Sequence, residues 1–339
     1  MKVRYSRQIL FSPIGSAGQE KLANSTVLLV GVGALGCSQA EMLARAGVGK
    51  VQLVDRDFVE YSNLQRQTLF SEEDAEERMP KAVAAKRRIS QINSEIEVED
   101  IIADVTNSNI ERLVSGCDLV LDGTDNFQVR YLVNDACVKA GVPWIYGAAV
   151  SSYGMTMNII PGETPCLRCI FPELPDPGSA PTCDTAGVIA PVVARVAATQ
   201  VAEAFKFLVG DRDSLSRKLR QFDVWTNEEK AIGTGSPDPN CETCGKRNFE
   251  FLDAASSEFA AVLCGRDAVQ IAPNANSKLD LDQLADRLKW NFAVNQNEYL
   301  LRFAPDEFEL TVFTDGRAIV KGTDDATVAR TLYAKYIGV

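Results

Sequence analysis

A glycine-rich hexapeptide is the first part of this 339-residue sequence whose composition points to chemistry. The run Gly31-Val32-Gly33-Ala34-Leu35-Gly36 follows the apolar segment 26–30 and opens a helical pattern. Glycines at these spacings let the backbone approach a phosphate closely and let the helix pack against the strand. Asp55 ends the next apolar run, and positions 36 and 55 lie 19 apart, where an acidic side chain meets a ribose hydroxyl. The pattern predicts a nucleotide site, and alone it fits an NAD(P)-dependent oxidoreductase equally well.

Polar residues beyond Asp55 favour a nucleotide with three phosphates. Arg66 and Lys81 supply fixed positive charge for the β and γ phosphates, and Asn63 can hydrogen-bond near the ribose or phosphates. Asp125 follows the fourth apolar run, where a carboxylate can hold a Mg²⁺ that bridges phosphates, although it can also cap the next helix. The candidate nucleotide contacts are Gly31, Gly33, Ala34, Gly36, Asp55, Asp57, Asn63, Arg66, Gln67, Lys81 and Asp125.

Four cysteines form two Cys-x-x-Cys pairs, Cys166-Leu167-Arg168-Cys169 and Cys241-Glu242-Thr243-Cys244. Positions 169 and 241 lie 72 apart, which is longer than a zinc finger but suits a clip between distant segments. Four thiolates would complete a tetrahedral structural zinc site. Free thiols or a redox pair are the alternative, but neither pair adjoins a thioredoxin-like pattern.

Cys183 stands apart from both pairs, at the end of a proline-rich stretch and just before a long helical pattern. A helix N-terminus would lower the pKa of its thiol, whereas Asp184 would oppose this effect. A nucleophile and an unreactive loop cysteine therefore both stay open. Four further cysteines lie beside apolar residues and are expected to pack as small hydrophobic side chains: Cys37, Cys117, Cys137 and Cys264.

The elements that must position these residues alternate between strand and helix. Strands are predicted from apolar runs at 26–30, 51–54, 98–102, 119–121 and 144–146. Helices are predicted to begin near Leu35, Lys81, Ser108 and Asn126, with Asn107 and Asp125 as N-caps. This βαβ series predicts an α/β fold with a Rossmann-like, doubly wound, mostly parallel sheet.

The second half of the chain changes pattern after Gly154. An alternating strand over 155–160, a loop with four prolines, a helix over 188–208 and a strand over 219–224 are expected to complete the sheet with additional antiparallel strands. The Gly/Ser/Pro segment 233–240 is the candidate linker. We predict one domain over 1–248 and a small C-terminal α+β domain over 249–339, with a strand at 261–271, a helix at 281–288, a hairpin at 300–320 and a last helix.

Composition excludes several classes of function. The net charge of −11 and the pI of about 4.8 provide no long-range attraction to nucleic acid or anionic lipid. The segment 188–208 carries Arg195, Glu203 and Lys206, and the N-terminus lacks a secretory pattern, so we expect a cytoplasmic protein without a membrane span. Histidine is absent, which removes imidazole as a base or metal ligand.

In their order along the chain, these motifs resemble those of the E1-like ThiF/MoeB/HesA adenylyltransferases. The shared motifs are Arg4-Tyr5-Ser6-Arg7-Gln8, the glycine run, Asp55 with Ser62-Asn63-Leu64-Gln65-Arg66-Gln67, Pro80-Lys81, Thr124-Asp125-Asn126 and Ala186-Gly187-Val188. Ala34 departs from the glycine more usual in the family, at a variable position. The resemblance covers about residues 1–248, and the remainder is similar only to extensions of some bacterial members.

The resemblance implies ATP- and Mg²⁺-dependent adenylation of the C-terminal carboxylate of a small ubiquitin-like sulfur-carrier protein ending in Gly-Gly. It implies that Asp55 binds ribose, that Asn63, Arg66 and Lys81 bind the triphosphate, and that Asp125 positions Mg²⁺. It also implies zinc at the four paired cysteines and a homodimer in which Arg7 reaches the γ-phosphate of the other subunit. In some relatives the cysteine matching Cys183 takes the acyl group or joins it through sulfur, whereas in the molybdopterin branch it is dispensable.

The missing histidine is no obstacle to this reaction. A C-terminal carboxylate has a pKa of about 3.5, so it is ionised at neutral pH and needs no general base. Catalysis then consists of aligning two anions and neutralising charge with Mg²⁺, Arg7, Arg66 and Lys81. Thiamin, molybdopterin and other carriers stay open, with the thiazole branch of thiamin favoured. A nicotinamide oxidoreductase and a carrier-binding scaffold without turnover are the alternative functions.

Overall fold

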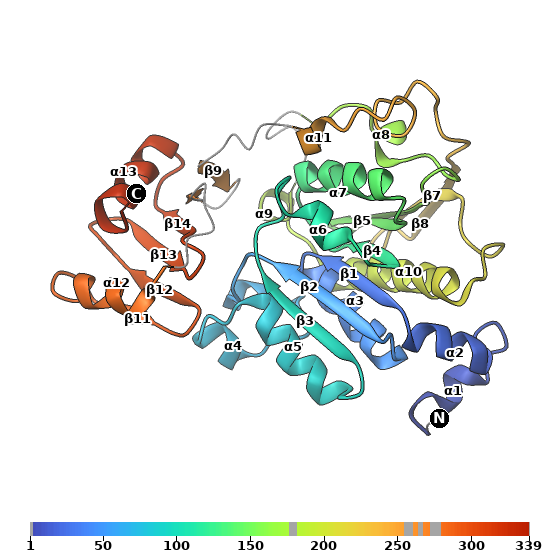
Figure 1. Cartoon of the computed structure of the whole chain (residues 1–339), viewed down its shortest axis with the longest axis horizontal. Helices are drawn as coiled ribbons and strands as arrows, with labels where there is room; N and C mark the ends of the chain where they lie inside the picture. Colours follow the sequence, from blue (N-terminus) through green and yellow to red (C-terminus); the bar gives the residue numbers. More distant parts are fainter. Residues whose placement is uncertain (1–2, 176–181, 254–259, 264–266, 272–278, 339) are drawn as a thin grey trace. The chain divides into compact units, whose positions relative to one another are not determined.

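The computed structural model describes residues 3–175, 182–253, 260–263, 267–271 and 279–338 (Figure 1). It divides into two compact units, Met1–Ala255 and Ser256–Val339, and each unit has its own sheet and its own hydrophobic core. Cys264, which was expected to pack as a small hydrophobic residue, lies outside the described residues. Among the described residues, no helix combines the length and apolar character needed to cross a bilayer.

In the described part of the first unit, eight strands form one sheet in the order β3-β2-β1-β4-β5-β6-β7-β8. They are β1 (Thr26–Val30), β2 (Lys50–Asp55), β3 (Glu97–Ile102), β4 (Leu119–Asp122), β5 (Trp144–Val150), β6 (Tyr153–Ile159), β7 (Lys218–Asp223) and β8 (Glu228–Gly233). The strands from β3 to β5 pair in parallel, and β6 to β8 pair antiparallel. The strand order reverses between β1 and β4, which is where open α/β sheets bind ligands.

The predicted α/β fold is confirmed, but the last strand was missed. All residues of β8 are exposed, so its sequence has no alternation of buried and exposed positions to recognise. The prediction of a linker over 233–240 was also wrong, because this segment lies inside the first unit and leads to Cys241.

The helices of the first unit cover both faces of the parallel strands. The described ones are α1 (Ser6–Ile9), α2 (Gly15–Ala23), α3 (Ala34–Ala46), α4 (Glu72–Glu76), α5 (Lys81–Ile92), α6 (Ile110–Val114), α7 (Phe127–Ala140), α8 (Leu167–Ile170), α9 (Cys183–Ala186), α10 (Ala190–Val209) and α11 (Glu250–Asp253), with 3-10 turns η1 (Val3–Tyr5) and η2 (Tyr61–Asn63). Val27 and Leu29 of β1 pack in the cluster formed with α3, α5 and α10, whereas Leu28 and Val30 pack in the cluster formed with α6 and α7. Because β1 is buried on both faces, its sequence is a continuous apolar run.

Helix α7 begins at Phe127, one residue later than predicted. The Asn126 side chain accepts hydrogen bonds from the amides of Gln128 (2.8 Å) and Val129 (3.3 Å), so Asn126 and not Asp125 is the N-cap. At α6 the N-cap position is Asn109, two residues after the predicted Asn107. The expected capping role of Asp125 was therefore wrong, and its carboxylate stands outside the helix end.

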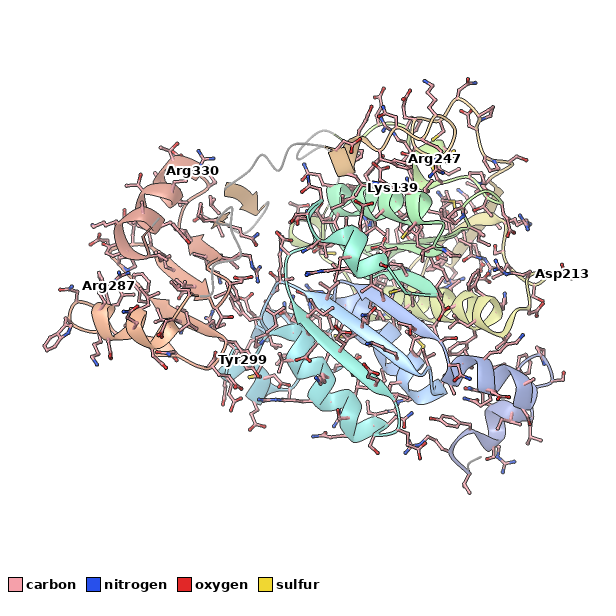
Figure 2. The ribbon with its side chains drawn as sticks, in the orientation of Figure 1. Lys139, Asp213, Arg247, Arg287, Tyr299 and Arg330 are labelled. Carbon is pink, nitrogen blue, oxygen red and sulfur yellow. The ribbon has the colours of Figure 1, made fainter. Side chains whose placement is uncertain are left out.

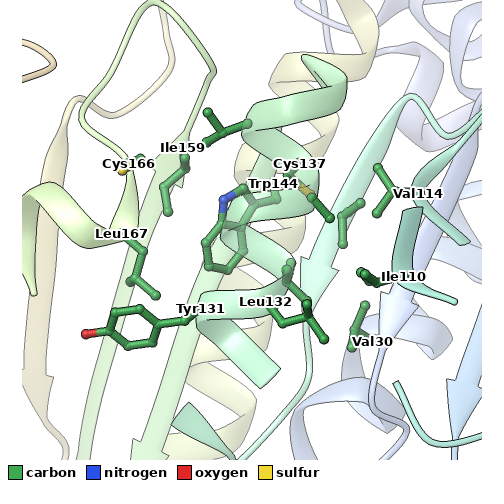
Figure 3. Packing of buried hydrophobic residues seen from close by; sticks show 14 of the residues in the cluster. Val30, Ile110, Val114, Tyr131, Leu132, Cys137, Trp144, Ile159, Cys166 and Leu167 are labelled. Carbon is green, nitrogen blue, oxygen red and sulfur yellow. The ribbon is translucent and has the colours of Figure 1, made fainter. Parts of the chain in front are cut away.

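Helix α7 packs on β5 and β6 around a large aromatic side chain. Figure 3 shows Trp144 of β5 among Tyr131 and Leu132 of α7 and Ile159 of β6, all within one buried cluster. Cys166 and Leu167 of the first Cys-x-x-Cys pair belong to the same cluster. The paired cysteines thus lie at the margin of the main core.

Phe249 belongs to the first unit. Its ring lies under two cations, Lys139 of α7 and Arg247 (labelled in Figure 2), at 6.0 and 5.3 Å from the ring centroid. Leu252 of α11 packs in the same core cluster as α7. These contacts extend the first unit past residue 248.

The second unit contains an antiparallel sheet, described in the order β11-β12-β13-β14-β10-β9. Its elements are β9 (Ala260–Leu263), β10 (Ala268–Ile271), α12 (Leu281–Leu288), β11 (Asn295–Gln296), β12 (Leu300–Phe303), β13 (Glu309–Phe313), β14 (Ala318–Lys321) and α13 (Ala326–Tyr336). The strand predicted over 261–271 is two paired strands, and the predicted hairpin contains three strands. The turn at Asp315-Gly316 joins β13 to β14 as expected, with Gly316 at φ +83°.

Candidate functional site

The glycine run connects β1 to α3 at the reversal of strand order. Gly31 has φ +90°, a conformation that favours glycine. A Cβ at Gly36 would lie 2.1 Å from the Gly31 carbonyl oxygen, and a Cβ at Gly123 after β4 would lie 2.4 Å from the same atom. The ends of β1 and β4 therefore approach each other at a distance that only glycine allows.

The backbone at the start of α3 has no close contact with side chains from elsewhere in the described chain. The nearest heavy atom to a Cβ built at Gly33 is Gln67 Nε2, 3.9 Å away. Gly33 is the N-cap of α3 and Ala34 its first residue, so the first amides of a 13-residue helix lie at this point. Backbone amides and the positive end of the helix dipole favour a phosphate at such a place.

The end of β2 is hydrogen-bonded to the glycine loop. The Asp55 carboxylate accepts hydrogen bonds from the amides of Val32 and Asp57, both at 2.7 Å. Burial raises the pKa of Asp55, and the nearby Lys81 ammonium opposes this shift. Asp55 thus lies beside the loop, where the sequence predicts a ribose contact.

Lys81 is a buried cation beside this carboxylate. Its side chain is 6% exposed, its Nζ lies 3.4 Å from Asp57 Oδ2, and its amide donates to the Asp57 carbonyl at 2.9 Å. The bridge between Phe58 and Pro80 brings the two chain segments together. The structure therefore places Asp55, Asp57 and Lys81 together at the end of β2, although they are up to 26 positions apart (55 and 81).

Asn63, Arg66 and Gln67 lie on the turn that follows. Asn63 is buried, and its side chain accepts from the Glu60 amide at 3.0 Å. Arg66 is partly exposed and donates to the Ser62 carbonyl at 3.0 Å. Gln67 is buried, and in the described part of the chain its Oε1 has no hydrogen-bond partner. The turn holds its shape through local bonds and brings Gln67 to Gly33.

Asp125 lies beyond the end of β4, on a loop that two buried residues hold. Arg130 Nε pairs with Asp122 Oδ2 at 3.0 Å, and Arg130 Nη2 donates to the carbonyls of Thr124 (2.6 Å) and Gly147 (3.0 Å). Asp122 Oδ1 accepts from the amide and hydroxyl of Thr124 at 2.9 and 2.8 Å. The Asp125 carboxylate itself is exposed. We call the residues at these strand ends, Gly31–Gly36, Asp55, Asp57, Lys81 and Asp125, the nucleotide edge.

Sequence reasoning missed the network around Asp122 and Arg130. Two buried amides also belong to it: the Nε2 atoms of Gln39 and Gln200 donate to the Asp122 carbonyl at 2.9 and 3.0 Å. These residues come from β4, α7, α3 and α10, so their proximity is not visible in the sequence. The available signal was the presence of polar residues on the buried faces of otherwise apolar helices.

Arg7 lies away from the nucleotide edge of its own chain. It is exposed on α1, whose neighbour Gln8 donates to the carbonyl of Ala46, the last residue of α3. The glycine loop stands at the other end of this 13-residue helix, roughly 18 Å away along its axis. The chain therefore does not bring Arg7 to its own glycine loop.

The four paired cysteines meet in one cluster, which we call the four-cysteine centre (Cys166, Cys169, Cys241 and Cys244). All their sulfur atoms lie within 4.8 Å of one another. The Sγ separations are 3.8 Å for Cys166–Cys169, 3.6 Å for Cys166–Cys241 and 3.4 Å for Cys169–Cys244. A tetrahedron with zinc–sulfur bonds of about 2.3 Å has sulfur atoms about 3.8 Å apart. The donor set and its spacing fit zinc.

Without a cation, these thiols cannot all be ionised. The hydrogen bond with Cys169 raises the pKa of Cys166, and burial raises the pKa of Cys244 to about 12. A bound divalent cation would reverse both effects, because it favours the thiolate form of each ligand.

Cys183 lies at the same end of the sheet as the nucleotide edge. It is the first residue of α9, it is half-buried, and its Sγ is 3.5 Å from the carbonyl oxygen of Ala149 in β5. Strand β5 runs parallel to β4, so both end at this edge. By contrast, Cys37, Cys117 and Cys137 are buried in core clusters, as small hydrophobic side chains would be.

Comparison with known proteins identifies relatives along the whole chain. The model of the ThiF family matches residues 5–243. The sulfur carrier protein ThiS adenylyltransferase of Bacillus subtilis is 46% identical over 340 residues, which cover 100% of both chains. The SAMP-activating enzyme E1 of Haloferax volcanii is 37% identical over 74% of this chain and 91% of its own.

A solved structure has the same fold over most of the first unit. The crystal structure of Escherichia coli MccB with ATP superposes with a TM-score of 0.63 at 29% identity. The match covers 72% of this chain and 75% of that one.

Proposed function

Because the chain belongs to the ThiF family, we propose that it is an ATP-dependent adenylyltransferase that activates the C-terminal carboxylate of a small sulfur-carrier protein. The observation that carries the proposal is the nucleotide edge. There, a glycine loop, the Asp55 carboxylate and the buried Lys81 ammonium lie together at the reversal of strand order. A nicotinamide oxidoreductase and a silent scaffold are not favoured, since the full-length relative is named for adenylyl transfer.

ATP would lie across the ends of β1, β2 and β4. The amides at the start of α3 would bind phosphate oxygens, and Asp55 would accept a hydrogen bond from ribose. Lys81 and Arg66 would approach the β and γ phosphates, with Asn63, Asp57 and Gln67 as neighbouring polar contacts. The buried Oε1 of Gln67, which has no hydrogen-bond partner among the described residues, suits a donor group of the ligand.

The chemistry needs only one bond to form and one to break. A carboxylate oxygen of the carrier terminus attacks the α-phosphorus, the bond to the oxygen bridging the α and β phosphates breaks, and pyrophosphate leaves with that electron pair. No proton is transferred in this step, because the carboxylate is ionised at neutral pH. The cations of the site therefore stabilise negative charge that moves onto pyrophosphate.

Asp125 would hold Mg²⁺ at this edge. Its carboxylate is exposed beyond β4, and the Asp122–Arg130 pair holds the loop that carries it. Hard oxygen ligands of this kind suit Mg²⁺, which commonly keeps several waters and binds phosphates directly. When bound, the ion would neutralise phosphate charge and orient the leaving group.

Arg7 would act in a homodimer. Its position at the far end of α3 excludes a contact with its own phosphate loop, so a second copy would have to supply it. The exposed apolar side chains beside it, Leu10 and Phe11, are 72% and 61% exposed and would be covered by such a partner.

The carrier would be a ubiquitin-like protein of the ThiS type, ending in Gly-Gly. Support comes from the relative that matches both units at 46% identity, whereas the archaeal relative covers 74% of the chain. The product would supply thiocarboxylate formation for the thiazole of thiamin. We further propose zinc at the four-cysteine centre and a cytoplasmic site of action, where thiols stay reduced. We also propose that in a later step the Cys183 thiol attacks the acyl carbon of the adenylate, which forms a thioester, breaks the bond to AMP and releases the thiol proton.

Pyrophosphate exchange tests the proposal. The enzyme, Mg·ATP and either a ThiS-like or a MoaD-like carrier are mixed, and labelled pyrophosphate incorporation into ATP is followed. We expect exchange with the ThiS-like carrier and an AMP mass increment on its C-terminus. Absence of exchange with every Gly-Gly carrier would contradict the adenylyltransferase function.

Two variants separate the parts of the mechanism. Asp125→Ala should lower exchange about 100-fold or more without changing the unfolding transition, because the loop is held by Asp122 and Arg130. Cys183→Ala should keep exchange and lose only the later sulfur-linked step. Full exchange in Asp125→Ala would show that the metal-holding residue is misassigned.

A further inference from the structure

Helix α7 carries four buried side chains whose polar atoms reach other segments of the first unit. Arg130 bonds the Asp125 loop, the Tyr131 hydroxyl lies 2.8 Å from the carbonyl oxygens of both Phe171 and Glu173, and Asn134 and Asp135 follow one turn later. All four side chains are at least 95% buried. Buried polar groups on a helix are expensive unless each has a specific partner, so the partners identify what the helix holds.

Asn134 and Asp135 each hold one of the two Cys-x-x-Cys turns. Asn134 Oδ1 accepts the amide of Leu167, which lies between Cys166 and Cys169, at 2.9 Å. Asp135 Oδ1 accepts the hydroxyl of Thr243, which lies between Cys241 and Cys244, at 2.8 Å. Two adjacent residues of one helix therefore contact the interior of both turns.

Asp135 has a second bond that fixes its own position. Its Oδ2 accepts the amide of Phe251 at 3.0 Å, and the Phe251 ring packs against Tyr131 with centroids 5.0 Å apart. Thr243 is fully buried, so its hydroxyl has no access to water as an alternative partner. The bond between Thr243 and Asp135 is therefore a dry contact with both partners held in place.

The two Cys-x-x-Cys turns come from segments 72 positions apart (169 and 241). Short turns by themselves do not hold two pairs of sulfur atoms within bonding range of one ion, yet all four sulfur atoms lie close together. Tetrahedral ligation tolerates errors of a few tenths of an ångström. A rigid helix that bonds both turns places them before the ion arrives and removes part of the ordering cost of binding.

We propose that Asp135 is a positioning residue of the four-cysteine centre, which acts through the Thr243 hydroxyl to hold the second cysteine turn in metal-binding geometry, with Asn134 holding the first. The inference rests on the proposed zinc site. It concerns zinc affinity and not the adenylation step, so the two can fail separately.

The Thr243 hydroxyl offers a test that removes one bond at nearly constant volume. Purified full-length protein is loaded with one zinc, and transfer of zinc to a chromogenic chelator is followed at neutral pH. Thr243→Val should weaken zinc binding about 10- to 100-fold, the usual effect of losing a group that orients a metal ligand. Thr243→Ser keeps the hydroxyl and should stay within about threefold of the parent.

Asp135→Asn gives a graded second variant. The amide oxygen can still accept the Phe251 amide while its NH₂ group donates to Thr243 Oγ1, so we expect a loss below tenfold. Asp135→Ala removes both bonds and should weaken zinc binding at least as much as Thr243→Val.

Glu203→Gln is the matched control. Glu203 is another buried carboxylate, which holds the loop after α10 by accepting from Asn158 Nδ2 at 2.6 Å and the Ser216 amide at 2.8 Å. The Glu203→Gln variant should lower the midpoint of unfolding and leave the zinc affinity unchanged. Equal zinc affinity in Thr243→Val and the parent would overturn the positioning role, as would equal weakening in Glu203→Gln. A parent protein that binds no zinc would instead contradict the proposed metal.

Discussion

At the nucleotide edge, polar groups are held by the sheet: β1 and β4 end in contact at Gly31 and Gly123, and the buried Asp122–Arg130 pair fixes the loop beyond β4. At the four-cysteine centre, the sulfur atoms come from two turns outside the strands, and the thiols cannot all ionise together without a cation. The sheet itself therefore holds the first region, whereas the α7 side chains hold the second, and the second needs an ion to stabilise its thiolates. The difference means that each region should respond to a different kind of perturbation.

Among changes at the nucleotide edge, Arg130→Ala should lower the free energy of unfolding most. It removes one partner of a buried ion pair and leaves Asp122, which is 2% exposed, with an uncompensated charge. We expect a loss of about 3–5 kcal/mol in the free energy of unfolding, measured by urea titration. Arg45→Ala is the control, because its pair with Glu41 is exposed and should cost under about 0.5 kcal/mol. Similar losses in both would refute a structural role for the buried pair.

Zinc removal should have the next largest effect, and it should spare the nucleotide edge. A site held at a free zinc concentration about 1,000-fold above its dissociation constant contributes about 4 kcal/mol, so chelation should lower the Tm of the first unit by roughly 8–16 °C. Calorimetry measures this shift, and ATP titration of the zinc-free protein below its Tm should give an unchanged dissociation constant. A parallel loss of ATP affinity would show that the two regions are not independent.

Lys81→Met should lower both catalysis and stability. The ammonium is the buried cation nearest Asp55 and Asp57, and its loss should lower the rate of carrier adenylation about 100- to 1,000-fold. The midpoint of thermal unfolding should also fall, because the variant leaves the Asp55 and Asp57 carboxylates without their nearest buried cation. Unchanged adenylation would mean that the phosphates lie elsewhere.

Gly36→Ala should give the smallest of these effects on folding. The added Cβ would lie 2.1 Å from the Gly31 carbonyl oxygen and would force β1 and α3 apart, at about 1–3 kcal/mol. Gly233→Ala is the control, since nothing lies within 4 Å of a Cβ at that exposed strand end. Chemical denaturation should show a loss only for Gly36→Ala, and equal values would contradict the close approach.

The positions of three parallel strands could be predicted because β1, β4 and the first half of β5 are buried on both faces, which leaves continuous apolar runs in the sequence. The exposed edge strand β8 has no such signal, and its Glu and Lys residues also suit a loop. The cap of α7 was misjudged by one residue, since Asp125 and Asn126 have equal propensity for that position and only the backbone geometry distinguishes them.

By itself, the sequence determined which chemical groups are present: glycines where backbones meet, a lysine and an arginine that we expect at phosphate, two pairs of cysteines that suit a metal, and no histidine. The spacing of the motifs is enough to predict these residues, because their roles depend on backbone geometry over short stretches of sequence. Only the tertiary structure decided which groups hold the others in place, including Arg130 beneath the Asp125 loop and Asp135 beneath Thr243. The bonded pairs, Thr124–Arg130 and Asp135–Thr243, lie 6 and 108 positions apart and form only when α7 packs against the sheet, so no local pattern encodes them.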